Sequence, residues 1–277
     1  MEMSRAAHAF SALGHPDRLA VFRLVMRFAP GGVRPTEIAG ALGIRPNTLS
    51  HHLADLSAAG LLRCERRGRS LLYSADLGMT ETLIGYLARD VGRGRPDLLS
   101  VLQPLMEMPA MQDGGFNVLF LCTGNSARSV MAEALLRDLG GERFRAHSAG
   151  LWPKGAIHPL ALDVLARNGH DTRGLRPKGM AEVQAQGAPA MDFVFTLCDR
   201  AAAEDCPAWA GQPITGHWGL PDPAGATGTE AERALAFAQC HGMLRRRIAA
   251  FVALPFGSLS RMSLQARVDA LATQGEG

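Results

Sequence analysis

Apolar residues change their spacing along this chain from a helical period to short continuous runs. In the first part they recur every three or four residues, which predicts two short helices with a common buried side; these positions are Ile38, Leu42, Leu49, Leu53 and Leu56. After residue 115 they form runs typical of buried parallel strands, most clearly at 116–121 and 191–197. We therefore expect a helical domain with one hairpin, followed by an α/β domain in which strands alternate with helices.

A stretch in which neither pattern holds separates the two parts. Between residues 92 and 115, glycine and proline occur at a density that breaks regular elements, which indicates a linker. The predicted divisions are a first domain over 1–92, a linker over 93–115, a second domain over 116–258 and a C-terminal tail over 259–277. A short helix is expected in the tail, and residues 274–277 are expected to fray.

Composition narrows the classes of protein that this chain can belong to. The 277 residues are 47% hydrophobic and 20% charged, which is ordinary for a globular protein and excludes wholesale disorder. Residues 1–10 lack a signal-peptide pattern, and no apolar run is long enough to span a membrane. Five cysteines in so long a chain do not form a disulfide framework. We therefore expect a cytoplasmic protein with no membrane partner.

Charge is distributed unevenly between the two parts. Residues 1–110 contain 13 arginines, no lysine and ten acidic residues, so the whole formal net charge of +3 lies there. This excess favours an anionic partner for the first domain. A solvated surface that happens to carry arginines explains it equally well.

The termini of the two short helices can be placed from capping residues. Thr36 is the predicted N-cap of the first helix, and Gly43 ends it. The second helix is predicted from Asn47 to about Ala59, with Gly60 as its C-cap. Its exposed face carries short polar side chains that suit base edges in a major groove, and these are Asn47, Thr48, Ser50, His51 and Asp55. Because neighbouring residues point to different helix faces, we expect one of His51 and His52 to face DNA or solvent and the other to pack.

A basic hairpin is predicted directly after the second helix. Two runs containing apolar residues flank Arg67-Gly68-Arg69 within residues 61–73. A hairpin tipped with arginine after a recognition helix can reach the minor groove or the phosphates, so Arg67 and Arg69 are candidate DNA contacts. Cys64, the only cysteine of this domain, is interpreted as a structural apolar residue.

Three segments of the first domain carry a family resemblance. Leu13-Gly-His-Pro-Asp-Arg-Leu-Ala-Val-Phe-Arg-Leu24, Leu49-Ser-His-His-Leu53 and Arg67-Gly-Arg69 followed by Tyr73 resemble winged-helix repressors of the ArsR type over residues 5–90. The resemblance implies a winged helix-turn-helix fold and a homodimer that binds pseudo-palindromic operator DNA. It does not imply a metalloid sensor, because residues 29–35 and 88–92, where many members place cysteines, contain none. The effector of this domain is not identified by the sequence.

A strand, a loop and a helix at the start of the second domain form the main chemical motif. The strand at 116–121 runs into Cys122, Arg128 follows six positions later, and residues 130–139 form an amphipathic helix. The remaining loop positions are Thr123, Gly124, Asn125, Ser126, Ala127 and Ser129. Backbone N–H groups of such a loop, with the helix N-terminus, form a cradle for a tetrahedral oxyanion. The positive field should keep the sulfur of Cys122 as a thiolate, and the Arg128 fork suits two oxygens of the anion.

Two further cysteines allow a redox reaction at this loop. Cys198 directly follows the strand at 191–197, and Cys206 lies eight positions further on. Because the carboxyl ends of parallel strands line one crevice, Cys122 and Cys198 are expected to share a site. The three thiols permit a relay in which Cys122 attacks arsenate, Cys198 releases arsenite and Cys206 takes over the disulfide. The alternative is that Cys198 and Cys206 are small buried residues. Asp222 is the candidate acid for the departing oxygen.

The same motifs carry a second resemblance. Cys122 to Ser129, Ser148-Ala-Gly150, the Cys198 and Cys206 pair, and Trp218-Gly-Leu-Pro-Asp-Pro-Ala224 resemble arsenate reductases of the low-molecular-weight tyrosine-phosphatase type over residues 116–255. This resemblance implies a four-stranded parallel sheet with helices on both faces, and the roles just given for the three cysteines, Arg128 and Asp222. It also implies a possible potassium site at Asn125, Glu133 and Ser148. Ala224 stands where phosphatases usually place an aromatic residue, which favours a reductase.

Together the two halves predict one multidomain protein. We expect a three-cysteine arsenate reductase fused to an ArsR-type regulator of arsenic resistance, acting on arsenate or phosphate and on operator DNA. No tightly bound cofactor is expected, only an external dithiol such as thioredoxin or a glutathione and glutaredoxin system. Two alternatives remain: a phosphotyrosine phosphatase fused to a regulator, and a repressor whose oxyanion loop only binds a ligand. Cys240 and His241 are interpreted as packing or surface residues.

Overall fold

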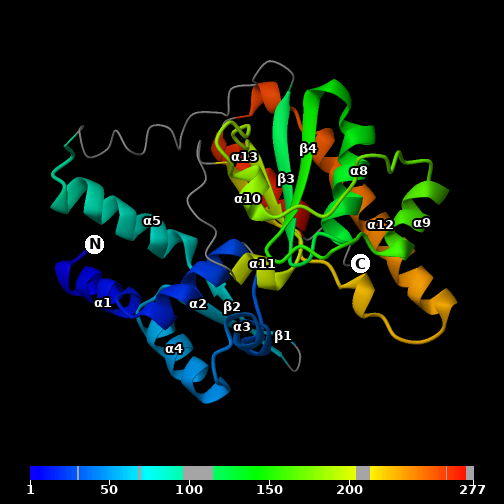
Figure 1. The fold of residues 1–277 in the computed structure, drawn as a ribbon. Helices are drawn as coiled ribbons and strands as arrows, with labels where there is room; N and C mark the ends of the chain where they lie inside the picture. The colour runs from blue at the N-terminus through cyan, green and yellow to red at the C-terminus, as the bar shows by residue number, and fades with distance from the viewer. Residues whose placement is uncertain (30, 68–69, 96–114, 204–212, 260, 273–277) are drawn as a thin grey trace. The chain divides into compact units, whose positions relative to one another are not determined.

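A computed structural model gives the structure of residues 1–29, 31–67, 70–95, 115–203, 213–259 and 261–272. The chain divides into two compact units, Met1–Leu105 and Met106–Gly277 (Figure 1). Several predicted features lie outside the described residues, namely Arg69, most of the linker, Cys206 and residues 274–277. Among the helices that are described, none is long and apolar enough to cross a membrane.

The first unit is helical with one two-stranded hairpin. Its helices α3 and α4 are the two predicted helices of the helix-turn-helix pattern. A π-helical turn, Leu87–Val91, follows the last helix. The elements in chain order are α1 (Met3–Leu13), α2 (Pro16–Arg27), α3 (Pro35–Leu42), α4 (Pro46–Ala58), β1 (Leu62–Arg67), β2 (Ser70–Ala75) and α5 (Leu77–Tyr86).

The start of α3 differs from the prediction. Its N-cap is Arg34 rather than Thr36, and Pro35 occupies the first helical position, where its missing N–H costs no intrahelical bond. The Glu37 carboxylate accepts a hydrogen bond from the Arg34 N–H at 2.7 Å, so the cap is supplied by the third helical residue and not by a threonine hydroxyl. Gly43 ends the helix with a φ of 67°, as predicted.

The predicted hairpin forms between β1 and β2, with Arg67 opposite Ser70. Tyr73 in β2 also pairs with Val33, through two backbone hydrogen bonds of 2.9 Å. The interpretation of Cys64 as a structural apolar residue is wrong, because its side chain is exposed in β1. The consecutive residues Arg63 to Arg66 of β1 are all exposed, so both faces of the strand lie in solvent there.

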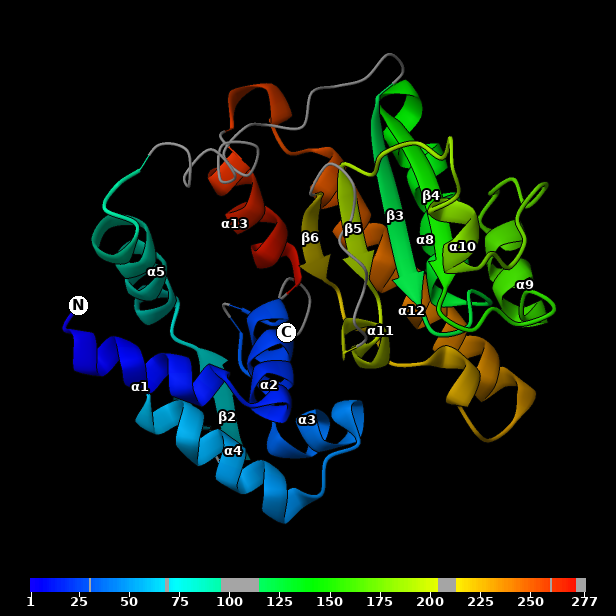
Figure 2. The same cartoon turned by 60° about the vertical axis from the view of Figure 1, so that its left-hand side comes forward.

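The second unit contains the predicted four-stranded parallel sheet, in the order β4-β3-β5-β6. Figure 2 shows α8 and α12 behind the sheet and α10 in front of it. The strands are β3 (Phe116–Cys122), β4 (Phe144–Gly150), β5 (Phe193–Thr196) and β6 (Ile214–His217). The helices are α8 (Arg128–Gly140), α9 (Pro159–Arg167), α10 (Met180–Val183), α11 (Asp199–Ala203), α12 (Glu230–Val252) and α13 (Arg261–Ala272), with short 3₁₀ turns at Gly141–Arg143, Pro223–Gly225 and Phe256–Ser258.

Both faces of the sheet are buried, which explains the continuous apolar runs in its strands. Alternate residues of β3 point to opposite faces. One face carries Phe116, Val118 and Phe120, which join the large core formed with α8, α12 and α13. The other carries Leu119 and Leu121, which belong to a smaller cluster beside α10. The tail is part of the large core through α13, whose buried residues are Leu264, Val268 and Leu271.

Candidate active site

The loop between β3 and α8 is held by the segment 151–158, which donates hydrogen bonds to the loop's carbonyl oxygens. Those of Cys122, Thr123, Gly124 and Ser126 each accept a backbone hydrogen bond from the segment 151–158, at 2.8 to 3.2 Å. With its carbonyls bound on this side, the loop turns N–H groups toward its own concave side, which is the arrangement that binds an anion. Asn125 completes the turn with a φ of 43°, a left-handed conformation that asparagine tolerates better than most residues.

The Cys122 side chain is 3% exposed and lies on that concave side. The Asn125 N–H donates to its Sγ at 3.1 Å, and Ser129 Oγ lies 2.8 Å from the same sulfur. The amide Nδ2 of Asn125 donates to Ser129 Oγ at 2.9 Å. Because the serine oxygen already accepts that bond, its own proton is directed toward the sulfur. Both contacts place hydrogen-bonding groups of the loop directly against the sulfur.

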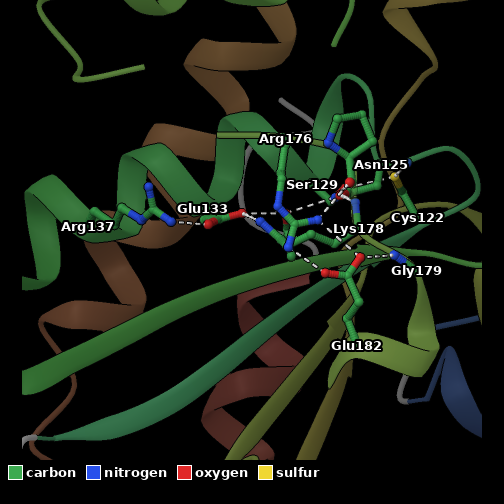
Figure 3. A network of polar contacts seen from close by, with 11 residues as sticks. Cys122, Asn125, Ser129, Glu133, Arg137, Arg176, Lys178, Gly179 and Glu182 are labelled. Atoms are coloured by element: carbon green, nitrogen blue, oxygen red, sulfur yellow. Dashed lines mark hydrogen bonds and ion pairs between the residues drawn. The ribbon is translucent and has the colours of Figure 1, made fainter. Parts of the chain in front are cut away.

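A buried polar network continues from the loop to α8 and to residues 176–182 (Figure 3). The Asn125 side chain also donates to Ser148 Oγ at 2.8 Å, and its Oδ1 accepts the backbone N–H of Lys178 at 2.6 Å. Ser148 donates to the carboxylate of Glu133, which is 1% exposed. The Lys178 Nζ lies 2.7 Å from the same carboxylate, and Arg137 pairs with its other oxygen. The three residues of the possible potassium site are thus together, with a lysine ammonium beside them.

Two residues that support the loop were given no role from the sequence. A Cβ on Gly150 would lie 2.9 Å from the Asn125 nitrogen, so only glycine lets β4 approach the loop this closely. Lys178 enters the network from a segment 45 residues after Glu133 along the chain. The sequence shows Gly150 as part of the Ser148-Ala-Gly150 motif, but it does not show why a glycine is needed there. No motif near Lys178 indicates that this residue contacts Glu133.

Arg128 is the first residue of α8. Its guanidinium points toward the segment 220–222, which directly precedes the 3₁₀ turn Pro223–Gly225. Its Nη1 donates to the carbonyl oxygen of Leu220 at 2.9 Å, and its Nη2 lies 3.2 Å from Asp222 Oδ2. Arg128 is buried, while the Asp222 side chain is half exposed. The structure therefore brings the predicted anion clamp and the predicted acid into contact. Asp222 also accepts the Ala224 N–H at 3.2 Å, which fixes the turn.

Cys198 reaches the same loop from the end of β5. The Leu197 N–H donates to the Leu121 carbonyl at 2.8 Å, so the ends of β5 and β3 lie side by side. The buried Cys198 Sγ lies 3.3 Å from Thr123 Oγ1, the hydroxyl next to Cys122 in the chain. Two of the three predicted redox cysteines therefore border one loop, while the third, Cys206, lies outside the described residues.

Side-chain contacts hold the first turn of α11, which directly follows Cys198. Asp199 lies 3.3 Å from Nε2 of His217, and this hydrogen bond lowers the pKa of the Asp199 carboxyl. His217 Nδ1 lies 2.8 Å from Thr196 Oγ1 in the neighbouring strand. The Arg200 guanidinium lies 4.6 Å from the ring centroid of Trp152. Neither Asp199 nor His217 was singled out from the sequence, because the pair forms only when β6 comes to lie beside β5.

Cys240 does not have the environment of a reactive thiol. It is buried in α12, and burial raises the pKa of its thiol to about 12. A thiol with so high a pKa stays protonated at neutral pH and is a poor nucleophile. The neighbouring His241 is also buried. Both residues therefore pack, which is one of the two interpretations drawn from the sequence.

The first unit presents a polar surface on α4. All five side chains predicted for its outer face are exposed: Asn47, Thr48, Ser50, His51 and Asp55. His52, one position after His51, is buried, so the two histidines divide as predicted. The backbone of Arg67 ends β1, and its side chain and Arg69 lie outside the part that the structure describes.

Comparison with known proteins places both units in families. The model of the low molecular weight phosphotyrosine protein phosphatases matches residues 117–263, and that of a helix-turn-helix domain matches residues 13–65. The chain belongs to the low molecular weight phosphotyrosine protein phosphatase family and carries a helix-turn-helix domain before it. Within that family its second unit is of the arsenate reductase type, as its relatives show.

The curated relatives are bacterial arsenate reductases that the chain spans almost completely. It is 35% identical to the arsenate reductase of Halalkalibacterium halodurans over 134 residues, which is 48% of this chain and 93% of the relative. It is 34% identical to that of Bacillus subtilis over the same share of both chains. A solved structure described as "An arsenate reductase in the phosphate binding state" is 28% identical and covers 50% of this chain and 97% of its own, with a TM-score of 0.41.

Proposed function

We propose that this protein reduces arsenate to arsenite by a relay of three cysteines and binds operator DNA through its first unit. The observation that carries the enzymatic part is the meeting of two thiols at one anion-binding loop. Cys122 Sγ accepts the Asn125 N–H at 3.1 Å, and Cys198 contacts Thr123, the next residue of that loop. A phosphatase needs only the first of these thiols, whereas reduction of arsenic needs a second sulfur to accept the oxidation.

The first step joins arsenate to Cys122. Loop N–H groups and the N-terminus of α8 bind the oxyanion, and Arg128 turns from Leu220 and Asp222 to hold two of its oxygens. The thiolate of Cys122 attacks arsenic, an S–As bond forms, and one As–O bond breaks. Asp222 protonates the departing oxygen, which leaves as water. Arsenic remains As(V) at this stage.

The second step reduces arsenic. The thiolate of Cys198 attacks Cys122 Sγ, the S–As bond breaks, and its electron pair stays on arsenic, which leaves as arsenite, As(III). The two sulfurs supply the two electrons and form a Cys122–Cys198 disulfide. Cys206 then attacks Cys198 Sγ, which frees Cys122 and leaves a Cys198–Cys206 disulfide. An external dithiol, either thioredoxin or a glutathione and glutaredoxin system, reduces this bond.

The short helix α11 suits the third step. Cys206 lies eight positions after Cys198, and a continuous helix between them would keep the two sulfurs apart. The described helix α11 has only five residues. The contacts of Asp199 with His217 and of Arg200 with Trp152 hold its first turn, which keeps Cys198 beside Thr123.

Mass spectrometry of the reacted protein tests the relay. The fully reduced protein is mixed with arsenate without any external dithiol, quenched by alkylation and digested. The expected products are one equivalent of arsenite and a disulfide that joins Cys198 to Cys206. Treatment with phosphate in place of arsenate is the control and yields no disulfide, because phosphorus is not reduced. Arsenate-dependent linkage of other cysteines, or arsenite without any disulfide, would contradict the relay.

The proposed DNA contacts are the outer face of α4 and the tip of the hairpin. The polar side chains exposed on α4 suit contacts with base edges in a major groove. The chain is proposed to act as an ArsR-type homodimer on a pseudo-palindromic site, because two copies present two such helices to successive major grooves.

Removal of the hairpin arginines is expected to weaken DNA binding at every sequence. Arg67→Ala and Arg69→Ala each remove a phosphate contact, so each should lower operator affinity about tenfold and reduce the salt dependence of binding by about one counterion. Fluorescence anisotropy over a range of KCl concentrations measures both quantities. Arg173→Ala, which changes an exposed arginine of the second unit, is the matched control and should leave both unchanged. If Arg67→Ala and Arg69→Ala both kept the wild-type affinity and salt dependence, as Arg173→Ala should, the hairpin would not contact DNA.

We also propose that the Lys178 ammonium supplies the positive charge that the possible potassium site would otherwise take from solution. Nζ of Lys178 lies 2.7 Å from a Glu133 oxygen, in direct contact with the carboxylate. The carboxylate is buried and bonded to Ser148, which in turn is bonded to Asn125 of the loop. A covalently attached cation at this place orients the loop without any bound metal ion.

Lys178→Met is therefore expected to destabilise the protein and to make it respond to potassium. The substitution leaves a buried carboxylate with Arg137 as its remaining cation, so the free energy of unfolding should fall by about 2–4 kcal/mol. Urea denaturation in NaCl and in KCl measures the loss and its recovery. Arg167→Met breaks an exposed ion pair on α9 and should cost less than about 1 kcal/mol. An equal response of the wild-type protein to potassium would contradict the proposed role of Lys178.

A further inference from the structure

Three potential metal ligands meet in the first unit, which carries none of the residues of the proposed relay. They are His15 and Asp17, at the start of α2, and His52, in the middle of α4. Each offers one ligand atom, and these atoms all lie within 4.8 Å of one another. The two imidazole rings face each other with centroids 5.0 Å apart. Nothing in the proposed DNA contacts or in the relay uses any of the three side chains.

His52 supplies the observation that distinguishes this cluster from a chance grouping. Its side chain is 9% exposed, and its Nε2 is fully buried with no hydrogen-bond partner among the described residues. A buried imidazole nitrogen without a partner is costly in a folded protein. The nearest carboxylate oxygen, Oδ2 of Asp17, lies 3.6 Å away, which is too long for a hydrogen bond. The same separation suits two ligands of one ion, since ligands at about 2.1 Å from a tetrahedral Zn²⁺ lie about 3.4 Å apart.

His15 supplies the third potential ligand. It is the N-cap of α2, and its Nδ1 accepts the Asp17 N–H at 3.2 Å. Nδ1 therefore holds a lone pair on this side of the ring, and it binds a metal when it exchanges the Asp17 N–H for the ion. Asp17 is half exposed, so a fourth position remains open to water.

We propose that His15, Asp17 and His52 bind a divalent transition-metal ion. Two imidazoles and one carboxylate form a donor set that Zn²⁺ and Co²⁺ accept, whereas Mg²⁺ and Ca²⁺ prefer oxygen ligands alone. A bound ion would tie the first turn of α2 to the buried side of α4 that carries His52. If α4 binds DNA as proposed above, the ion also fixes the helix that carries the DNA contacts, and this consequence rests on the proposed function.

Titration of the full-length protein with Co²⁺, in the absence of DNA, tests the site. The wild-type protein is expected to bind one ion per chain with the visible ligand-field absorption of a nitrogen and oxygen site. Asp17→Asn and His52→Gln should each weaken this binding at least tenfold. The matched control is His51→Gln, which changes the exposed neighbour of His52 and should leave Co²⁺ affinity unchanged. Because Asp17 lies at the surface, its variant keeps the test valid if His52→Gln fails to fold, as judged by circular dichroism.

Three outcomes would overturn the proposal. The first is unchanged Co²⁺ affinity in Asp17→Asn, and the second is an equal loss in His51→Gln. The third is absorption with sulfur-to-cobalt charge transfer that disappears in Cys122→Ser, which would place the ion at the thiols of the second unit. None of these readouts depends on arsenate reduction or on operator binding, so a failure here is distinguishable from a failure of the proposed function.

Discussion

Cys198→Ser is expected to abolish arsenate turnover and to leave the hydrolysis of p-nitrophenyl phosphate within about threefold of the wild-type rate. Hydrolysis needs Cys122, the loop, Arg128 and Asp222, all of which the variant retains. Reduction also needs a sulfur that attacks Cys122 Sγ, and a serine oxygen cannot form the disulfide. The substitution is small, and the side-chain hydrogen bond of Cys198 to Thr123 Oγ1 can be kept by a serine, so the loop should keep its shape.

Arsenite release and p-nitrophenol release are measured on the same preparations with a dithiol present. The two rates distinguish the loss of arsenate reduction from a loss of phosphate ester hydrolysis. Cys122→Ser should lose both activities by at least about a thousandfold, because it removes the nucleophile of both reactions. Cys64→Ser changes the exposed cysteine of the hairpin and should lose neither. Sustained arsenate turnover in Cys198→Ser would contradict the relay. Phosphate ester hydrolysis without any arsenite from the wild type would favour the phosphatase, and no turnover of either substrate would favour a ligand-binding repressor.

The parts of the site that sequence reasoning found are those fixed by local chain chemistry. A buried strand followed by Cys122 and a helix opening at Arg128 place a thiol beneath a helix N-terminus wherever the pattern occurs. The meeting of Cys122 with Cys198 also followed, because parallel neighbouring strands must end at one edge of the sheet. The hairpin and the strands at 116–121 and 191–197 were predicted because their apolar patterns are local signals, whereas the four strands of the sheet followed only from the family resemblance.

The residues that sequence reasoning missed depend on pairings between distant segments. Lys178 reaches Glu133 only after β4 and the segment 176–182 have packed on α8. The spacing of residues along the sequence does not predict that contact. His217 meets Asp199 only across the β5–β6 pair. The two local errors have local causes. Arg34 rather than Thr36 caps α3 because Pro35 prefers the first helical position. Cys64 is exposed because β1 lies in solvent on both faces from Arg63 to Arg66.

Arg128→Lys is expected to lower kcat/KM for arsenate by about a hundredfold to a thousandfold, although it keeps the positive charge. The guanidinium presents two parallel donors, here used for the Leu220 carbonyl and for Asp222, and the same fork fits two oxygens of a tetrahedral anion. An ammonium donates as a point and cannot hold both oxygens, and loss of one preorganised donor to a developing charge commonly costs this much. The Asp222 carboxylate also loses a partner that positions it.

Steady-state kinetics with arsenate and competitive inhibition by phosphate separate binding from chemistry in this variant. Phosphate should bind at least about tenfold more weakly, since the fork acts on the ground-state anion too, and the remaining loss should fall on kcat. Arg137→Lys changes an arginine that contacts Glu133 rather than the anion and should stay within about threefold of the wild type. If Arg128→Lys also stayed within that range, charge alone would hold the anion. The fixed spacing from Cys122 to Arg128 would then have no chemical reason.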